Sequence, residues 1–244
     1  MENQTIGIVG GMGYIATSYF VQRVVSTMKA TYGSDGNLPR ILVDFPPAIP
    51  SRDLAILKNG QVPSQVINSA ISGLHMGGAT AIVVACNAAH HYQSDFEFPK
   101  GCSFVSMRTE LGSQFSTTIN GNRVLALQST ASSKVKLWEH TTLNHGGIPV
   151  VMSDVFQEKV QALISAVKVD CSEVNTLVKQ VVDDVSKSDA QILLIGCTEL
   201  SLAFRETQVE DLELLDSTEI LCTQLLHHLQ ATSIDKLEKP NLES

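Results

Sequence analysis

The strongest constraint on the fold of this chain is the alternation of short runs of Val, Ile and Leu with longer amphipathic stretches. Such apolar runs are typical of strands buried on both faces of a parallel sheet, and the stretches between them are typical of helices that cover the sheet. The pattern therefore predicts an α/β protein. The strands are expected at Thr5–Val9, Arg40–Phe45, Ala79–Ala85, Arg123–Leu127, Pro149–Met152, Gln191–Ile195 and Leu212–Leu215.

Helical periodicity is clearest in two of the amphipathic stretches. Residues 16–29 and 64–76 each bring their apolar side chains to one face when they are placed on a helix. We expect a last helix at 218–230. The charged segment 234–244 contains Pro240 and is expected to be a flexible tail.

Two segments of the chain, Gly78–Asn87 and Asp189–Thr198, resemble each other. Each contains a buried strand that follows an amphipathic helix and ends in a small residue, a cysteine and a short polar residue. This internal match predicts two pseudo-symmetric α/β domains, each with a mostly parallel sheet flanked by helices. We expect the first domain at 1–112 together with 213–233, and the second at 113–212.

Charge and apolar patterning indicate the kind of partner. The 244 residues carry a formal net charge of −8, whereas nucleic acids and anionic membranes attract clustered Lys and Arg. No apolar run reaches the roughly 18 residues of a membrane span, and the first residues lack the pattern of a secretory signal. We therefore expect a cytoplasmic protein with a small-molecule partner, and neither a nucleic-acid nor a membrane partner.

The five cysteines form no CxxC pair, so the sequence suggests neither a disulfide framework nor a zinc site. A free cysteine is most often a small buried apolar residue, and its position must indicate otherwise. Cys86 and Cys197 are expected at the carboxyl ends of strands, where α/β sheets bind ligands. A neighbouring helix start is expected to lower the pKa of each thiol and make it a candidate base. Cys102, Cys171 and Cys222 lack this setting and are expected to be structural.

Two cysteines on opposite sides of a carbon can invert it, because a thiolate removes the Cα proton from one face while a thiol delivers a proton to the other. The developing carbanion needs hydrogen bonds to the substrate carboxylate, which backbone amides near Asn87 and Thr198 could donate. The alternative is a nucleophilic hydrolase, in which one thiol works with His90 or His91.

The loop at residues 10–13 presents a second, weaker signal. Gly11, Gly13 and Ala16 match the G-x-G-x-x-A form of a dinucleotide-binding loop. The acidic residue that should contact the ribose is expected about 20 residues further on, whereas Asp44 lies 33 residues beyond Gly11. A tight turn that lets a carboxylate approach the backbone explains the glycines equally well.

Taken together, these motifs resemble the aspartate/glutamate racemase superfamily, most closely its aspartate racemase branch, over nearly the whole chain. The resemblance implies a site in the cleft between two domains, a Cys86 and Cys197 pair that acts by two-base proton transfer without pyridoxal phosphate, metal or any other cofactor, and a homodimer. The substrate it implies is an acidic amino acid, aspartate first. The motifs that carry it are Gly7–Gly13 with Ala16 and Thr17, Ala85–His90, Gly196–Leu200 and Leu215–Ser217.

The resemblance also implies roles for individual residues. Arg52 corresponds to a basic residue that holds the side-chain carboxylate of the substrate, a task that suits a guanidinium fork; the alternative is a surface ion pair with Asp53 or Glu97. Lys168 corresponds to a second basic position or is a solvated helix end. The remaining substrate-binding positions are Met12, Asn87, Ala88, Ala89, Thr130, Thr198 and Glu199.

Several alternatives stay open at the level of the sequence. Glu199 anchors the amino group or only caps a helix, and His90 positions Cys86 or only completes the core. Tyr14 and Ala88 depart from the Pro and Thr that are usual in the family, which affects specificity or rate more than the fold. Other possible functions are a glutamate or broad-specificity racemase, a related isomerase, decarboxylase or hydantoin racemase, a non-catalytic sensor of acidic amino acids, and a dinucleotide enzyme.

Overall fold

The computed structural model describes residues 4–33, 36, 38–108 and 112–237, and contains two four-stranded parallel sheets. The strand order is β2-β1-β3-β4 in the first sheet and β6-β5-β7-β8 in the second. The α/β class and the seven expected strands are confirmed, with ends shifted by one or two residues. The short β4 is an additional strand. The strands are β1 (Thr5–Val9), β2 (Arg40–Asp44), β3 (Ala81–Val84), β4 (Ser103–Phe104), β5 (Arg123–Leu127), β6 (Ile148–Val150), β7 (Ile192–Ile195) and β8 (Glu213–Asp216).

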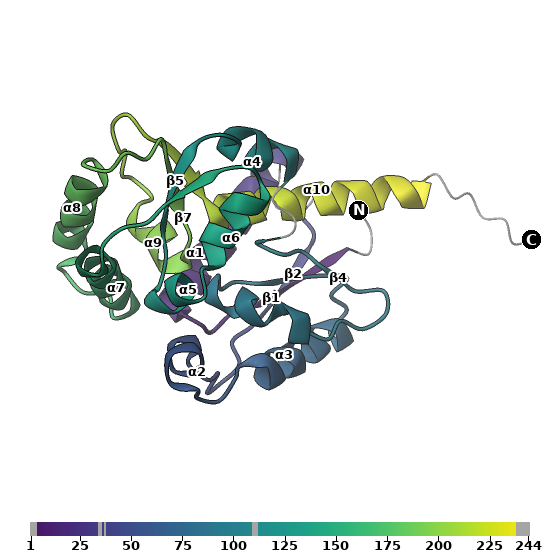
Figure 1. Ribbon diagram of the computed structural model, residues 1–244. Coiled ribbons are helices and arrows are strands. Elements are labelled where there is room, and N and C mark those ends of the chain that lie inside the picture. The colour runs from purple at the N-terminus through teal and green to yellow at the C-terminus, as the bar shows by residue number, and fades with distance from the viewer. Residues whose placement is uncertain (1–3, 34–35, 37, 109–111, 238–244) are drawn as a thin grey trace, which may run out of the picture.

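Helices cover both faces of each sheet (Figure 1). We call each sheet with its helices a lobe. The first lobe contains α1, α2, α3 and the 3-10 helix η2, and the second contains α4 to α9. The last helix, α10, returns to the first lobe. The helices are α1 (Tyr14–Tyr32), α2 (Arg52–Lys58), α3 (Ser64–Met76), η2 (Ala88–Asp95), α4 (Gly112–Ile119), α5 (Thr130–Lys134), α6 (Leu137–Asn144), α7 (Asp154–Lys168), α8 (Val174–Val185), α9 (Thr198–Ala203) and α10 (Ser217–Leu237).

The two central strands explain why continuous apolar runs appear in the sequence. In β3, Ala81 and Val83 face the core shared with α1 and α10, whereas Ile82 and Val84 face the core shared with α3. In β7, alternate residues likewise face the α7–α8 layer and the α4–α6 layer. A strand buried on both faces has no polar alternation, and its end is therefore sharply marked by the first small or polar residue.

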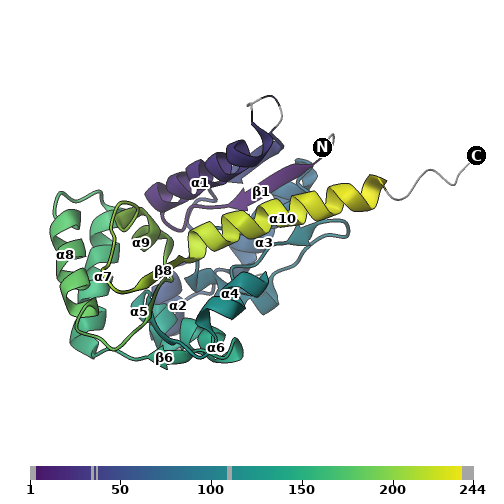
Figure 2. The same cartoon turned by 90° about the horizontal axis from the view of Figure 1, so that it is seen from above.

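The chain passes between the lobes at its C-terminal end. Strand β8 pairs with β7, so residues 213–216 lie in the second sheet and not with the first domain as expected. Helix α10 then packs beside α1 in the first lobe (Figure 2). We propose that the domain division lies between β8 and α10. The helix also continues to Leu237, so residues 234–237 are helical instead of belonging to a tail, and 238–244 lie outside the described residues.

Candidate active site

Cys86 and Cys197 follow β3 and β7, and both line the same cavity between the lobes. The exposed fractions are 6% for Cys86 and 8% for Cys197. The two strands are central in their sheets, so the pseudo-symmetry of the fold brings equivalent strand ends face to face. The enclosed space is about 20 Å³, roughly the room that one water molecule needs.

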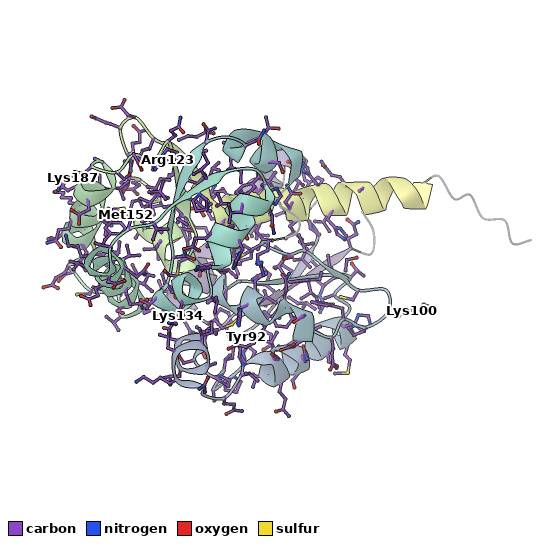
Figure 3. All side chains as sticks on the ribbon, viewed as in Figure 1. Tyr92, Lys100, Arg123, Lys134, Met152 and Lys187 are labelled. Carbon is purple, nitrogen blue, oxygen red and sulfur yellow. The ribbon has the colours of Figure 1, made fainter. Side chains whose placement is uncertain are left out.

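The cavity is lined by residues of both lobes. Of the expected binding residues it includes Met12, Arg52, Asn87, Ala88, Lys168, Thr198 and Glu199. Ala89 and Thr130 do not belong to the lining, and the backbone N–H of Thr130 donates to Gln161 Oε1 at 2.9 Å. Helix η2 of the first lobe contacts α5 of the second, and each helix contributes to the lining of the cavity. Tyr92 of η2 and Lys134 of α5 are labelled in Figure 3. The residues that were not expected in the lining are Asp53, Ser129, Ser132, Ile164 and Gly196.

The glycine loop after β1 is shaped by the second lobe. Gly13 has a φ of 139°, and a Cβ atom at this position would collide with Glu199 Oε1. The carbonyl of the neighbouring Met12 accepts a hydrogen bond from Arg52 Nη2 at 3.1 Å. The loop therefore uses its glycine for close approach of a carboxylate from the same protein, which accounts for the glycine without a dinucleotide.

Cys197 is the N-cap residue of α9, and its thiol donates to Glu199 Oε2 at 3.1 Å. Burial, the Glu199 carboxylate and Cys86 raise the pKa of the Cys197 thiol well above its ordinary value. The expected lowering of this pKa is therefore wrong for Cys197. The six-residue α9 and its end dipole are outweighed by loss of water and by a carboxylate in direct contact. The raised pKa favours the thiol form of Cys197 at neutral pH.

Glu199 is buried, with 4% of its surface exposed. Its Oε2 accepts from Cys197 and from the Thr198 hydroxyl at 3.3 Å, whereas its Oε1 has no hydrogen-bond partner among the described residues. The nearest cation is Lys168, at the end of α7, whose Nζ lies 4.0 Å from Oε1. Lys168 thus ends α7 at the wall of the cavity, with its ammonium group near a buried carboxylate.

Arg52 begins α2 and points its guanidinium into the site. Its two Nη atoms donate to the carbonyls of Pro50 and Met12, and its buried Nε has no hydrogen-bond partner within the described part of the chain. The described ion pairs include none between Arg52 and Asp53 or Glu97. Backbone carbonyls thus orient the fork while leaving its positive charge without a carboxylate partner.

Asn87 directly follows Cys86 and is 3% exposed. Neither its side-chain oxygen nor its side-chain nitrogen has a hydrogen-bond partner among the described residues, although both are buried. Leaving a buried amide unpaired costs about 1–3 kcal/mol per group. Asn87 lines the same cavity as both cysteines. An unpaired amide in that position is typical of a group that forms its hydrogen bonds only when a ligand is bound.

His90 is fully buried and does not contact the Cys86 thiol. Its Nδ1–H donates to the Cys86 carbonyl at 2.8 Å, and its Nε2 accepts the Met107 N–H at 3.2 Å. Burial lowers the pKa of His90 to about 4, so both ring nitrogens are committed to the backbone in the neutral form. His90 fixes the loop that carries Cys86, which removes it as the base of a cysteine hydrolase.

Residues 9–225 match the family model Asp/Glu/Hydantoin racemase. The chain belongs to this family. It is a racemase, and its fold agrees with that of solved relatives. An aspartate racemase of Picrophilus torridus is 26% identical, with a TM-score of 0.81 over 93% of this chain and 94% of that one. The broad specificity amino-acid racemase RacX of Bacillus subtilis is 24% identical over 220 residues, 88% of this chain and 94% of that protein.

A more distant solved racemase shares the fold. The glutamate racemase of Francisella tularensis, solved with D-glutamate, is 17% identical, with a TM-score of 0.58 over 96% of this chain and 83% of that one. In this racemase, no helix within the described residues is long and apolar enough to cross a membrane. The same residues contain no group of three or more His, Cys, Asp or Glu side chains arranged to hold a metal ion.

Two serines that line the cavity were not expected from the sequence. Ser129 follows β5 and caps α5, where its hydroxyl accepts from the Ser132 N–H at 3.2 Å. Both serines line the cavity. Their position after a strand of the second sheet is equivalent to that of the glycine loop after β1, and this topological equivalence is the signal that could have identified them. Tyr14, in contrast, is 58% exposed and stacks on Phe45 outside the lining.

The buried neutral His90 predicts a specific loss of stability in acid. Its folded pKa of about 4 lies below the unfolded value of about 6.5, so the unfolded chain binds more protons as the pH falls from 6.5 towards 4. At pH 5 this linkage removes about 2 kcal/mol of the free energy of unfolding relative to pH 7. Denaturant titrations at both pH values measure it.

The control is His90→Gln, which keeps a donor and an acceptor but does not titrate in this range. Asp216, whose pKa burial raises to about 6, stabilises the folded state as the pH falls and acts equally in both proteins. The comparison is therefore the difference between them. An equal loss of stability in the parent and in His90→Gln between pH 7 and 5 would contradict the assignment.

Proposed function

We propose that this protein is a cofactor-independent racemase that inverts the Cα of an acidic amino acid, aspartate first, by proton transfer between Cys86 and Cys197. The observation that supports this most directly is that both thiols line one cavity from opposite lobes. Arg52 and Lys168 supply cationic groups to the same cavity, and Asn87 supplies an unpaired amide.

In the proposed reaction one thiolate removes the Cα proton and becomes a thiol, while the opposing thiol donates its proton to the other face and becomes a thiolate. The electron pair of the broken C–H bond passes into the carboxylate and returns to form the new bond. Hydrogen bonds to that carboxylate stabilise the carbanion, and they gain strength where the bound substrate displaces water from the cavity. The net charge of the cysteine pair is unchanged.

The charges of the cavity support a dicarboxylic substrate. Lys168 lies beside Glu199, which offsets its charge, whereas Arg52 has no carboxylate partner among the described ion pairs. A guanidinium held by two backbone carbonyls is suited to bind a second carboxylate. The racemase of Picrophilus torridus is named for aspartate, which agrees with this assignment. The name of the Bacillus subtilis relative supports broad specificity as the second candidate.

Substrate must enter a space that now holds little more than one water molecule. We propose that the two lobes separate to admit it, since residues of both lobes form the walls. The chain passes from β8 in the second sheet to α10 in the first lobe, so a rotation of one lobe changes this connection. The homodimer and the cytoplasmic location remain predictions, and light scattering of the purified protein tests the first.

The proposal is tested by incubating the protein in deuterated water with L-aspartate, and separately with L-glutamate and L-alanine. Nuclear magnetic resonance follows deuterium at Cα, and chiral chromatography follows inversion. We expect exchange and inversion of aspartate together. Inversion without exchange would exclude proton abstraction, and binding without either would support a sensor.

Arg52→Met is expected to lower kcat/KM for aspartate by about 100-fold, because a charge-assisted fork to the side-chain carboxylate is worth roughly 1.5–3 kcal/mol. Residual activity on alanine should change only a few-fold. The ratio of the two substrates in the same variant controls for any loss of folded protein. Arg52→Lys, which keeps the charge without the fork, should fall between. An equal loss on both substrates would show that Arg52 does not select the acidic side chain.

A further inference from the structure

We propose that Glu199 sets the resting protonation of the cysteine pair: its carboxylate keeps the proton on Cys197 and leaves Cys86 as the thiol that is free to act as the base. This inference rests on the proposed two-cysteine function and makes the two nearly symmetric thiols unequal. It makes Glu199 a positioning residue for a proton, instead of a ligand for the substrate amino group or a helix cap, the two roles that the sequence left open.

The geometry places the carboxylate directly on the thiol. Oε2 of Glu199 accepts the Cys197 S–H at 3.1 Å, and the carboxyl is buried beneath the N-terminal turn of α9. A thiol that donates to a carboxylate is held in its protonated form, because removal of the proton would place two negative charges in contact. The raised pKa of Cys197 agrees with this arrangement.

The other half of the molecule has no equivalent carboxylate. Ala88 follows Cys86 by two residues, as Glu199 follows Cys197 by two, so the internal match places a methyl group where the second half has an acid. Ala88 and Glu199 both line the cavity. The two thiols therefore differ at this pair of equivalent positions, although the Asp53 carboxylate also lines the cavity.

The remaining contacts of Glu199 hold its carboxylate in place. Gly13 leaves the space for Oε1, and a side chain there would displace the carboxylate. Lys168 Nζ lies 4.0 Å from Oε1, on the oxygen that does not accept the Cys197 thiol. The charged and titratable groups that face the pair from the surrounding elements are Lys168 of α7, Arg52 and Asp53 of α2, and Cys86 after β3.

The inference gives the resting enzyme a defined form, in which the Cys197 thiol keeps its proton against Glu199 and Cys86 acts as the base. A substrate enantiomer whose Cα–H faces Cys86 can transfer its Cα proton to Cys86 and receive a proton from Cys197 without any earlier proton movement. The opposite enantiomer needs the proton to be moved from Cys197 to Cys86 between turnovers. Since the two enantiomers have equal free energies in water, the bias changes kcat and KM separately and leaves the ratio of kcat/KM at one.

The test measures the proton on Cys197 directly. In a Cys86→Ser background, the ultraviolet absorbance of the thiolate is followed against pH, and the same titration of Cys86→Ser/Cys197→Ser is subtracted to isolate Cys197. Adding Glu199→Gln should lower the midpoint by about one pH unit or more, because it removes the contacting negative charge. Glu199→Asp, with a shorter side chain, should lower it less and serves as the second variant if glutamine disturbs folding.

Glu206→Gln is the matched control, since it removes the same charge from an exposed side chain outside the cavity lining and should leave the midpoint unchanged. A midpoint that is unchanged in both Glu199 variants would overturn the inference. The titration of the variants does not depend on turnover. If the parent protein racemises aspartate but the midpoint does not shift, only this inference is refuted. If the midpoint shifts but the parent protein does not racemise, only the proposed function is refuted.

Discussion

Replacement of either Cys86 or Cys197 by serine is expected to lower kcat/KM for racemisation by at least about 1,000-fold, which corresponds to about 4 kcal/mol of transition-state stabilisation. In the proposed reaction each thiol acts as the base in one direction and as the acid in the other, and a serine hydroxyl is far too weak an acid to replace either. The factor must be the same for both enantiomers, because their equilibrium constant is one. Chiral chromatography of the product measures both directions.

The single variants should also separate the two half-reactions. With Cys86→Ser, only the enantiomer whose Cα–H faces Cys197 can exchange with deuterated water, and with Cys197→Ser only the other enantiomer can. Exchange should then proceed without inversion. If both variants exchange the same enantiomer, the thiols do not lie on opposite faces of Cα.

Cys222→Ser is the matched control for this series. Cys222 is as buried as the two site cysteines but lies inside α10, outside the cavity. Its substitution tests the cost of placing a hydroxyl in the core without touching the site. We expect full racemisation per folded molecule, and full activity in either site variant would refute the two-base scheme.

The sequence was sufficient for the fold because the central strands are buried on both faces. Uninterrupted runs such as Ile192–Ile195 end abruptly at Gly196 and Cys197, so the strand end and the functional residue are visible together. The same pattern after β3 identified Cys86. Parallel topology then brings equivalent ends to one edge, and this explains why two distant cysteines could be paired before the structure was known.

The electrostatic state of Cys197 could not be obtained in this way. A residue two positions beyond the cysteine can point towards the thiol or towards solvent, and the direction of Glu199 depends on Gly13 and Lys168, which are far away in the sequence. A helix start generally lowers the pKa of a thiol, but the carboxylate of Glu199 and burial raise the pKa of Cys197. Ser129 and Ser132 were missed for a related reason, since a serine after a strand has the pattern of an ordinary helix cap.

Asn87→Leu should separate function from stability more sharply than any other substitution in the site. The side-chain amide of Asn87 is buried with both polar atoms unpaired, so the folded protein carries a desolvation cost that leucine, of similar size, does not have. We expect the free energy of unfolding to rise by about 1 kcal/mol or more, because replacing an unsatisfied buried group by an apolar one is favourable. Denaturant titration measures this gain.

The same substitution should lower kcat/KM for aspartate by about 100-fold or more, since it removes the hydrogen bonds that the Asn87 amide makes to the substrate in the proposed reaction. Asn122→Leu is the matched control: its Nδ2 donates to the Thr118 carbonyl at 2.7 Å, outside the cavity. That variant should lose stability and keep activity. The opposite signs of the two stability changes are the decisive result, because a structural role for Asn87 predicts destabilisation in both proteins, whereas a group kept unpaired for substrate predicts stabilisation only when Asn87 is removed.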